Sequence, residues 1–239
     1  MAVSQYTSVK SGLTYYAGPH NFNGESYHEY REHNALVIAQ IMRGYGWKDN
    51  VIAGIFGNMQ VESSFNPGAY YGWADYSGTS FGLVQWDPTS KYENWADENG
   101  YAPYRDIEYQ CERIRLELET GLGGQYLNRD WGQYKEFNIT RSEFLSSNES
   151  PYWLASVFAY NYERPAVVID TEKYTDADRK NLQKRRGENA EYWYEIITGG
   201  EAPPGPGPDP DPEPTPVKRR GMSLPVFLAA TRRRIHVVR

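Results

Sequence analysis

The hydrophobic pattern of the 239-residue chain is mainly helical. In residues 34–44, apolar side chains recur at intervals of about three and four, and glycines follow. A second periodic run begins where Asp49 or Asn50 can cap a helix, and its apolar side chains fall on one face. The pattern predicts that this second helix ends near Phe65, before an Asn-Pro-Gly sequence that cannot continue it.

The segment after the second helix changes character. Glycines separate short β-prone pieces there, and residues 79–86 are the clearest of them, so we expect a small β-hairpin region. Helical spacing returns in residues 107–118, with Cys111 on the buried side, and again in residues 152–163 and 176–197. The expected fold class is therefore α+β, mainly α.

A proline-rich stretch marks the clearest domain boundary. In GGEAPPGPGPDPDPEPTP, prolines alternate with Asp or Gly, which prevents helix and sheet pairing and gives an extended spacer. The sequence predicts an N-terminal extension (1–33), a folded domain (34–199), a linker (200–216) and a short basic tail (217–239).

Charge is distributed unevenly between the tail and the rest of the chain. Seven basic and no acidic residues lie from Lys218 onward, so a chain of net charge −6 carries −13 before that point. An acidic body argues against nucleic acid as its partner. The tail alone could bind an anionic surface.

No signal peptide or membrane-spanning segment is expected from the apolar runs. The chain has one cysteine, so no disulfide framework is expected either.

Glu62 is the first candidate for chemistry. It follows the apolar positions of the second helix at helical intervals, so its carboxyl lies on the same stripe as core side chains. Partial burial favours the neutral form of a carboxyl, which can then donate a proton to a glycosidic oxygen near neutral pH. The alternative is a last-turn glutamate that only points into solvent.

Three ordered blocks carry a resemblance to a known family: AGIFGNMQVESSFNPG (53–68), SFGLVQWDP (80–88) and FAYNYERP (158–165). They resemble the phage tail lysozyme family and, more distantly, goose-type lysozymes and lytic transglycosylases. The first block is similar to the Glu-Ser-x-Phe-Asn-Pro context of their catalytic glutamate. Together, the blocks extend the resemblance over about residues 34–197.

The resemblance implies a lysozyme-like fold with Glu62 as the general acid. It also implies that Gln85 and Trp86 line a sugar cleft from the hairpin and that Tyr160 and Asn161 face it from the opposite helix. Amide and phenol groups can hydrogen-bond sugar hydroxyls, and an indole offers a flat apolar face. Each residue also has a competing role: Trp86 and Tyr160 in packing, and Gln85 in satisfying backbone groups of the hairpin.

A second carboxylate is needed if the chain hydrolyses with two acids. Asp87 is preferred because it adjoins the hairpin residues, and Asp75 is the other candidate, although both also fit ordinary turns. Without either, the substrate could complete the reaction itself, as in lytic transglycosylases. The histidines and the cysteine have no metal-ligand spacing, so neither a metal nor a cofactor is expected.

The expected function is cleavage of peptidoglycan glycan strands by a muramidase of the virion. The alternatives are a lytic transglycosylase forming 1,6-anhydro ends, a non-catalytic peptidoglycan-binding tail component, and a chitinase-like enzyme. The resemblance places the protein in a phage tail, or released from the host cytoplasm to the cell wall. Other virion tail proteins or an anionic envelope surface are candidate partners of residues 217–239.

Overall fold

The computed structural model describes residues 3–71 and 79–199. The predicted linker at 200–216 and the predicted tail at 217–239 lie outside the described residues, as does Asp75. The described part is mainly helical with two small antiparallel sheets, which confirms the α+β, mainly α class.

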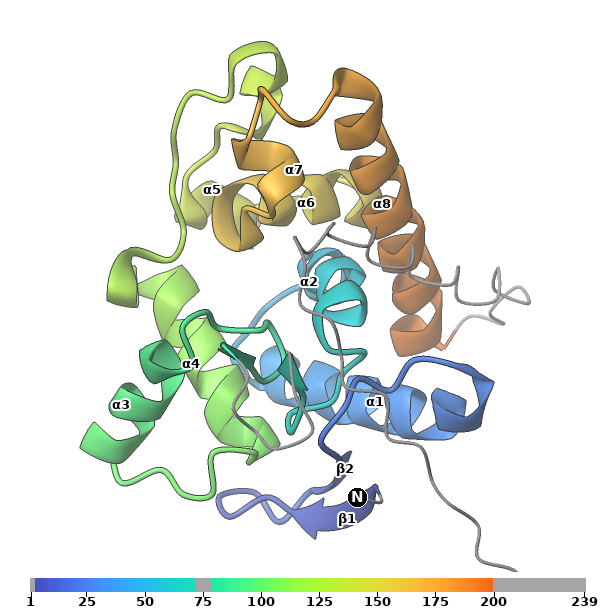
Figure 1. Cartoon of the computed structure of the whole chain (residues 1–239). Coiled ribbons are helices and arrows are strands. Elements are labelled where there is room, and N and C mark those ends of the chain that lie inside the picture. Colours follow the sequence, from blue (N-terminus) through green and yellow to red (C-terminus); the bar gives the residue numbers. More distant parts are fainter. Residues whose placement is uncertain (1–2, 72–78, 200–239) are drawn as a thin grey trace, which may run out of the picture. The chain divides into compact units, whose positions relative to one another are not determined.

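One helix lies at the centre of the folded unit. Helix α2 (Asp49–Glu62) packs against α6 (Pro151–Phe158) and α8 (Asp176–Thr198), and it contacts α1 (His28–Gly44) on another side (Figure 1). Every residue of α2 from Val51 to Met59 is buried. The apolar run that predicted this helix therefore faces neighbouring helices on several sides.

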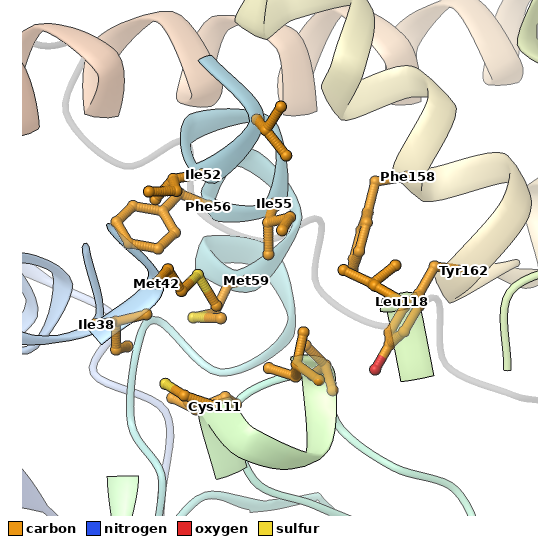
Figure 2. Packing of buried hydrophobic residues seen from close by; sticks show 14 of the residues in the cluster. Ile38, Met42, Ile52, Ile55, Phe56, Met59, Cys111, Leu118, Phe158 and Tyr162 are labelled. Carbon is orange, nitrogen blue, oxygen red and sulfur yellow. The ribbon is translucent and has the colours of Figure 1, made fainter. Parts of the chain in front are cut away.

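The core gathers side chains from helices that are far apart in sequence. Ile52, Ile55, Phe56 and Met59 project from α2, and Ile38 and Met42 of α1 meet them from below (Figure 2). Helix α4 (Ile107–Glu119) contributes Cys111 and Leu118, while Phe158 and Tyr162 close the other side (Figure 2). The prediction that Cys111 is buried is confirmed.

Two glycines let the neighbours of α2 approach its backbone closely. A Cβ on Gly54 would lie 2.6 Å from Cβ of Leu154 in α6, and a Cβ on Gly57 would lie 2.9 Å from Cβ of Ala190 in α8. Real Cβ atoms do not come this close, so only glycine fits at either position.

The predicted hairpin region is present and small. Strand β3 (Tyr70–Tyr71) pairs antiparallel with β4 (Ser80–Phe81), and a bridge joins Phe81 to Trp86. The hydroxyl of Ser63 donates a hydrogen bond of 2.8 Å to the carbonyl of Leu83. That bond ties the turn after β4 to the residue that follows Glu62.

A second hairpin lies in the region predicted only as an N-terminal extension. Strands β1 (Ser4–Thr7) and β2 (Thr14–Ala17) pair antiparallel, and Tyr15 and Ala17 are buried in the core. The side chain of Asn34 bonds to both backbone groups of Tyr16, which holds β2 against α1. The N-terminal residues are therefore part of the folded unit.

Several predicted helix limits were wrong by a few residues. Helix α1 begins at His28, not 34. Helix α2 begins at Asp49, and Lys48 at the N-cap position has no side-chain acceptor, so no side chain caps this helix. Helix α2 ends at Glu62, not near Phe65, because Phe65 takes a left-handed backbone conformation (φ 61°).

The predicted helix at 152–163 is also modified. Helix α6 passes into a π-helical turn, η4 (Ala159–Glu163), and Arg164 then adopts φ 49°. Proline at the next position disfavours the right-handed helical conformation for Arg164, which explains the end. The remaining helical elements, which the hydrophobic pattern did not predict, are η1 (Glu25–Tyr27), α3 (Ser90–Glu98), η2 (Leu122–Gly124), η3 (Gly132–Phe137), α5 (Arg141–Ser146) and α7 (Ala166–Ile169).

Candidate active site

Glu62 is the last residue of the central helix, and an arginine from α8 holds it. Its side chain is 22% exposed, whereas that of Arg186 is only 5% exposed. Nη2 of Arg186 lies 2.6 Å from Oε1 of Glu62, and Nη1 donates to Oδ1 of Asn58 at 2.6 Å. Asn58 is itself fixed by bonds to the carbonyls of Gly54 and Ala155. The carboxyl is therefore positioned by a rigid, buried partner while part of it stays open to solvent.

A second carboxyl group lies close to this pair. Oε1 of Glu163, at the end of η4, is buried and has no hydrogen-bond partner among the described residues. Burial raises the pKa of Glu163 well above its usual range, the negative charge of Glu62 raises it further, and Arg186 opposes both. Glu163 therefore carries a proton at pH values where ordinary glutamates have lost theirs.

A third carboxyl, that of Glu117, is buried with a full set of donors. It accepts bonds from Nε of Arg113 at 2.8 Å, from the indole of Trp86 at 3.2 Å and from the hydroxyl of Tyr162. Burial raises the pKa of Glu117, and the Arg113 charge together with these donors works against that rise. This group joins the hairpin to η4.

Trp86, which was expected to offer its face to a sugar, lies in the core of this structure. Trp86 is 2% exposed, stacks on Tyr92 at 4.7 Å and donates its N–H to Glu117. An indole packed on its face and bonded at its edge has no surface left for a ligand. The competing core role is the one observed.

Gln85 lies in the turn after β4 and supports that turn. Its backbone is left-handed (φ 48°), and its amide donates to the carbonyls of Gly82 at 2.9 Å and Ala69 at 3.2 Å. The side chain is half-buried. Gln85 thus holds the hairpin turn through its NH₂ group. Its side-chain oxygen accepts no hydrogen bond from another described residue.

Tyr160 and Asn161 are buried and face a neighbouring loop. Tyr160 is 1% exposed and accepts a bond from Gln183. Asn161 is fully buried, donates to the carbonyls of Phe137 and Val157, and accepts from the indole of Trp131. All donor and acceptor groups of the Asn161 amide are engaged, so this side chain supports the loop in the structure, and Tyr160 packs beside it with its hydroxyl bonded to Gln183.

Asp87 is exposed, and no bond to another described residue fixes its carboxylate. The structure brings together Glu62, Glu163 and Arg186, of which the sequence reading selected only Glu62. Glu163 lies in the third block of the resemblance, directly before Arg-Pro, so the sequence did contain a signal for this residue. Arg186 had no such signal, because contact with α2 depends on the packing of α8.

Within residues 3–71 and 79–199, no group of three or more His, Cys, Asp or Glu side chains could hold a metal ion. In the same residues, no helix is both long and apolar enough to cross a membrane.

Comparison with known proteins agrees with the resemblance in the sequence. Residues 33–197 match the phage tail lysozyme family. Morphogenesis protein 1 of Bacillus phage B103 is 39% identical over 169 residues, which are 70% of this chain and 40% of that protein. The chain therefore spans less than half the length of this curated relative. Because the family match covers most of the chain, the chain belongs to the phage tail lysozyme family.

Proposed function

We propose that the chain cleaves the β-1,4 bond between N-acetylmuramic acid and N-acetylglucosamine in peptidoglycan, with Glu62 as the general acid. The observation that carries the proposal is a partly exposed carboxyl at the end of a buried helix, fixed by a buried arginine. Membership of the phage tail lysozyme family supports the same chemistry. The substrate is then the cell wall of the phage's host, and the protein acts from the virion.

Arg186 has a clear role in such a reaction. When Glu62 gives its proton to the leaving oxygen, a carboxylate forms next to the guanidinium that already lies 2.6 Å away. A charge that is in place beforehand stabilises the developing negative charge without reorganisation. Asn58 on the other guanidinium nitrogen keeps that charge in position.

We further propose Glu163 as the second carboxyl of the site. The neighbouring Glu62 charge disfavours ionisation of Glu163, so the pKa of Glu163 lies above that of an ordinary glutamate. In this proposal Glu62, the partly exposed carboxyl, donates its proton to the substrate, and Glu163, whose Oε1 is buried, sets the charge beside it. The charged groups around Glu163 are Glu62 from α2, Glu117 from α4, Arg186 from α8 and its neighbour Arg164.

Digestion of purified peptidoglycan by wild type and by Glu62→Gln tests the acid role. The exposed Glu172 provides the matched control, Glu172→Gln. Loss of an acid lowers the rate by about 10²–10⁴-fold. Equal release of muropeptides by the Glu62 variant would remove Glu62 from the mechanism. Binding to the wall without any release by wild type would favour a non-catalytic tail component.

Mass spectrometry of the same digests assigns the reaction type. Reducing ends indicate hydrolysis, and 1,6-anhydro ends indicate a lytic transglycosylase. Asp87 stays the prediction for a group that activates water from the exposed side, and Asp87→Asn tests it. If this variant releases products at the wild-type rate, water activation does not depend on Asp87.

The pH dependence of the rate tests Glu163. Glu163→Gln removes the negative charge that forms beside Glu62 when Glu163 ionises, so the alkaline limb of the pH–rate profile should move to lower pH. A variant with a lower rate but an unchanged profile would show that Glu163 acts only through packing.

The segment at 217–239 is proposed to dock the protein on a virion component or an anionic surface, with residues 200–216 as the spacer. Its deletion should leave cleavage of soluble peptidoglycan intact and abolish co-sedimentation with virions or anionic vesicles. Unchanged co-sedimentation would refute docking by this segment.

A further inference from the structure

A cavity of about 580 Å³, whose lining does not include Glu62, lies between the N-terminal hairpin and the loop before α4. Its lining comes from β1 and β2, from Gly68 in the segment after α2, from the β3–β4 hairpin, from Asp97 in α3 and from residues 102–105. The volume is in the range of small-ligand sites, roughly 300–1,000 Å³. Part of the wall precedes residue 33, outside the region matched by the family.

The floor of this cavity is held rigidly. Asn66 is buried, and its amide bonds to both the N–H and the carbonyl of Gly18 and to the N–H of Gly68. A Cβ on Gly68 would lie 2.8 Å from the carbonyl oxygen of Gly18, so the two backbone segments are in direct contact. The backbone N–H of Tyr70 also donates to the carbonyl of Pro19. These bonds fix the two backbone segments that form this part of the cavity wall.

The walls combine aromatic faces with polar groups. Tyr6, Tyr70 and Tyr104 line the cavity and are half-buried. The Tyr6 ring also stacks on Tyr15, and the Tyr70 ring packs on Phe81. The hydroxyl of Tyr104 donates to Asp97 at 2.6 Å, which fixes that carboxylate on the wall. Flat rings beside fixed hydrogen-bonding groups suit a sugar ring, whose faces are apolar and whose edge carries hydroxyls.

Arg105 adds a positive charge on the same wall. Its guanidinium carbon lies 4.4 Å from the centre of the Tyr6 ring, and no carboxylate of a described residue forms an ion pair with it. A guanidinium held on an aromatic face keeps its N–H groups available for a carboxylate of a ligand. The cavity therefore has a place for a sugar ring and for one acidic group next to it.

We propose that this cavity binds a muramyl unit of peptidoglycan, with its sugar ring against the tyrosines and a carboxylate of its lactyl or peptide part on Arg105. The inference rests on the proposed function for the identity of the polymer, but it concerns binding and not bond cleavage. The N-terminal hairpin would then contribute to a second binding site for peptidoglycan, in addition to the Glu62 site.

The test is a titration of the full chain carrying Glu62→Gln with muramyl dipeptide, with the neutral disaccharide of N-acetylglucosamine as a second probe. Arg105→Gln should weaken binding of muramyl dipeptide by about tenfold or more and leave the neutral probe unchanged. Tyr104→Ala should weaken both. Arg129→Gln is the matched control, because Arg129 is also exposed and lies 4.2 Å over a ring, that of Trp131, outside the cavity.

Equal affinity of muramyl dipeptide for the Arg105 variant and its control would overturn the proposal, as would absence of binding at millimolar concentration. These results are separable from the digestion assay. If wild type cleaves the wall but Arg105→Gln does not change the affinity for muramyl dipeptide, only the cavity proposal fails. If the titrations behave as expected while no digestion occurs, only the proposed cleavage fails.

Discussion

Replacement of Gly57 by alanine tests the contact on which the candidate site depends. Gly57 faces α8, and an added Cβ would lie 2.9 Å from Cβ and 3.1 Å from the backbone N of Ala190. It would come closer still to the carbonyl oxygen of Arg186. These neighbours are backbone or Cβ atoms, so no side-chain rotation can make room and α8 must move away.

The size of the effect follows from two opposing contributions. In an exposed helix interior, alanine is more stable than glycine by roughly 1 kcal/mol. Overpacking of a tight interior costs about 1–3 kcal/mol, and the backbone contacts at Gly57 favour the upper part of that range. Gly44, the last residue of α1, has no atom within 4 Å of an added Cβ and is the matched control. We expect Gly57→Ala to be less stable than Gly44→Ala by about 1–3 kcal/mol.

Thermal or urea unfolding of the two variants measures this difference directly. For a domain of this size, each kcal/mol changes the melting temperature by about 2–4 °C. Peptidoglycan digestion should also slow in Gly57→Ala, because a displaced Arg186 no longer meets Glu62 in the same geometry. If Gly57→Ala is as stable as Gly44→Ala, α8 does not approach α2 as described, and the placement of Arg186 is wrong with it.

Three further predictions concern individual side chains of the site. Arg186→Gln should lower the rate of digestion by about tenfold to a hundredfold through misplacement of Glu62, measured as kcat; an unchanged rate would refute the positioning role. Trp86→Phe should reduce the free energy of unfolding by about 1–2 kcal/mol through the lost bond to Glu117 and leave binding of wall fragments unchanged; weaker binding would restore the sugar-contact role. The folded pKa of Glu163 is raised, so its stabilising contribution is complete below the ordinary value of about 4.5 and is lost as pH rises toward the folded pKa. Glu163→Gln should therefore be more stable than wild type at neutral pH but not below pH 4.5, and equal pH dependence of the two melting curves would contradict this.

The hydrophobic pattern predicted the helices of the core because burial imposes a strict spacing on them. Helix α2 and the buried side of α4 follow directly from that spacing. The β1–β2 hairpin escaped prediction because its buried residues, Tyr15 and Ala17, lie among aromatic and polar residues that give no long apolar run. Helix limits depended on single backbone conformations, such as that of Phe65, which the pattern does not encode.

The site was less predictable than the fold because its parts meet only through tertiary packing. Glu62 could be selected since its helical stripe and its sequence context agree. Trp86, Tyr160 and Asn161 were selected from the context alone, which does not distinguish a side chain that touches substrate from one that supports the residues around it. The salt bridge from Arg186 joins residues 124 positions apart, and no local signal reports such a contact.

Glu117 and Glu163 differ in whether their buried carboxyl oxygens have hydrogen-bond partners. Glu117 has an arginine, an indole and a phenol as donors, so its burial is compensated and its removal would leave Arg113 without a partner. Glu163 has a buried oxygen without any bond among the described residues, and its neighbour Glu62 repels a charge on it. Burial of a carboxyl oxygen without a partner costs stability, so Glu163 does not stabilise the fold through this oxygen. The uncompensated oxygen of Glu163, beside a carboxyl that is open to solvent, is the observation behind the proposed acid chemistry at Glu62.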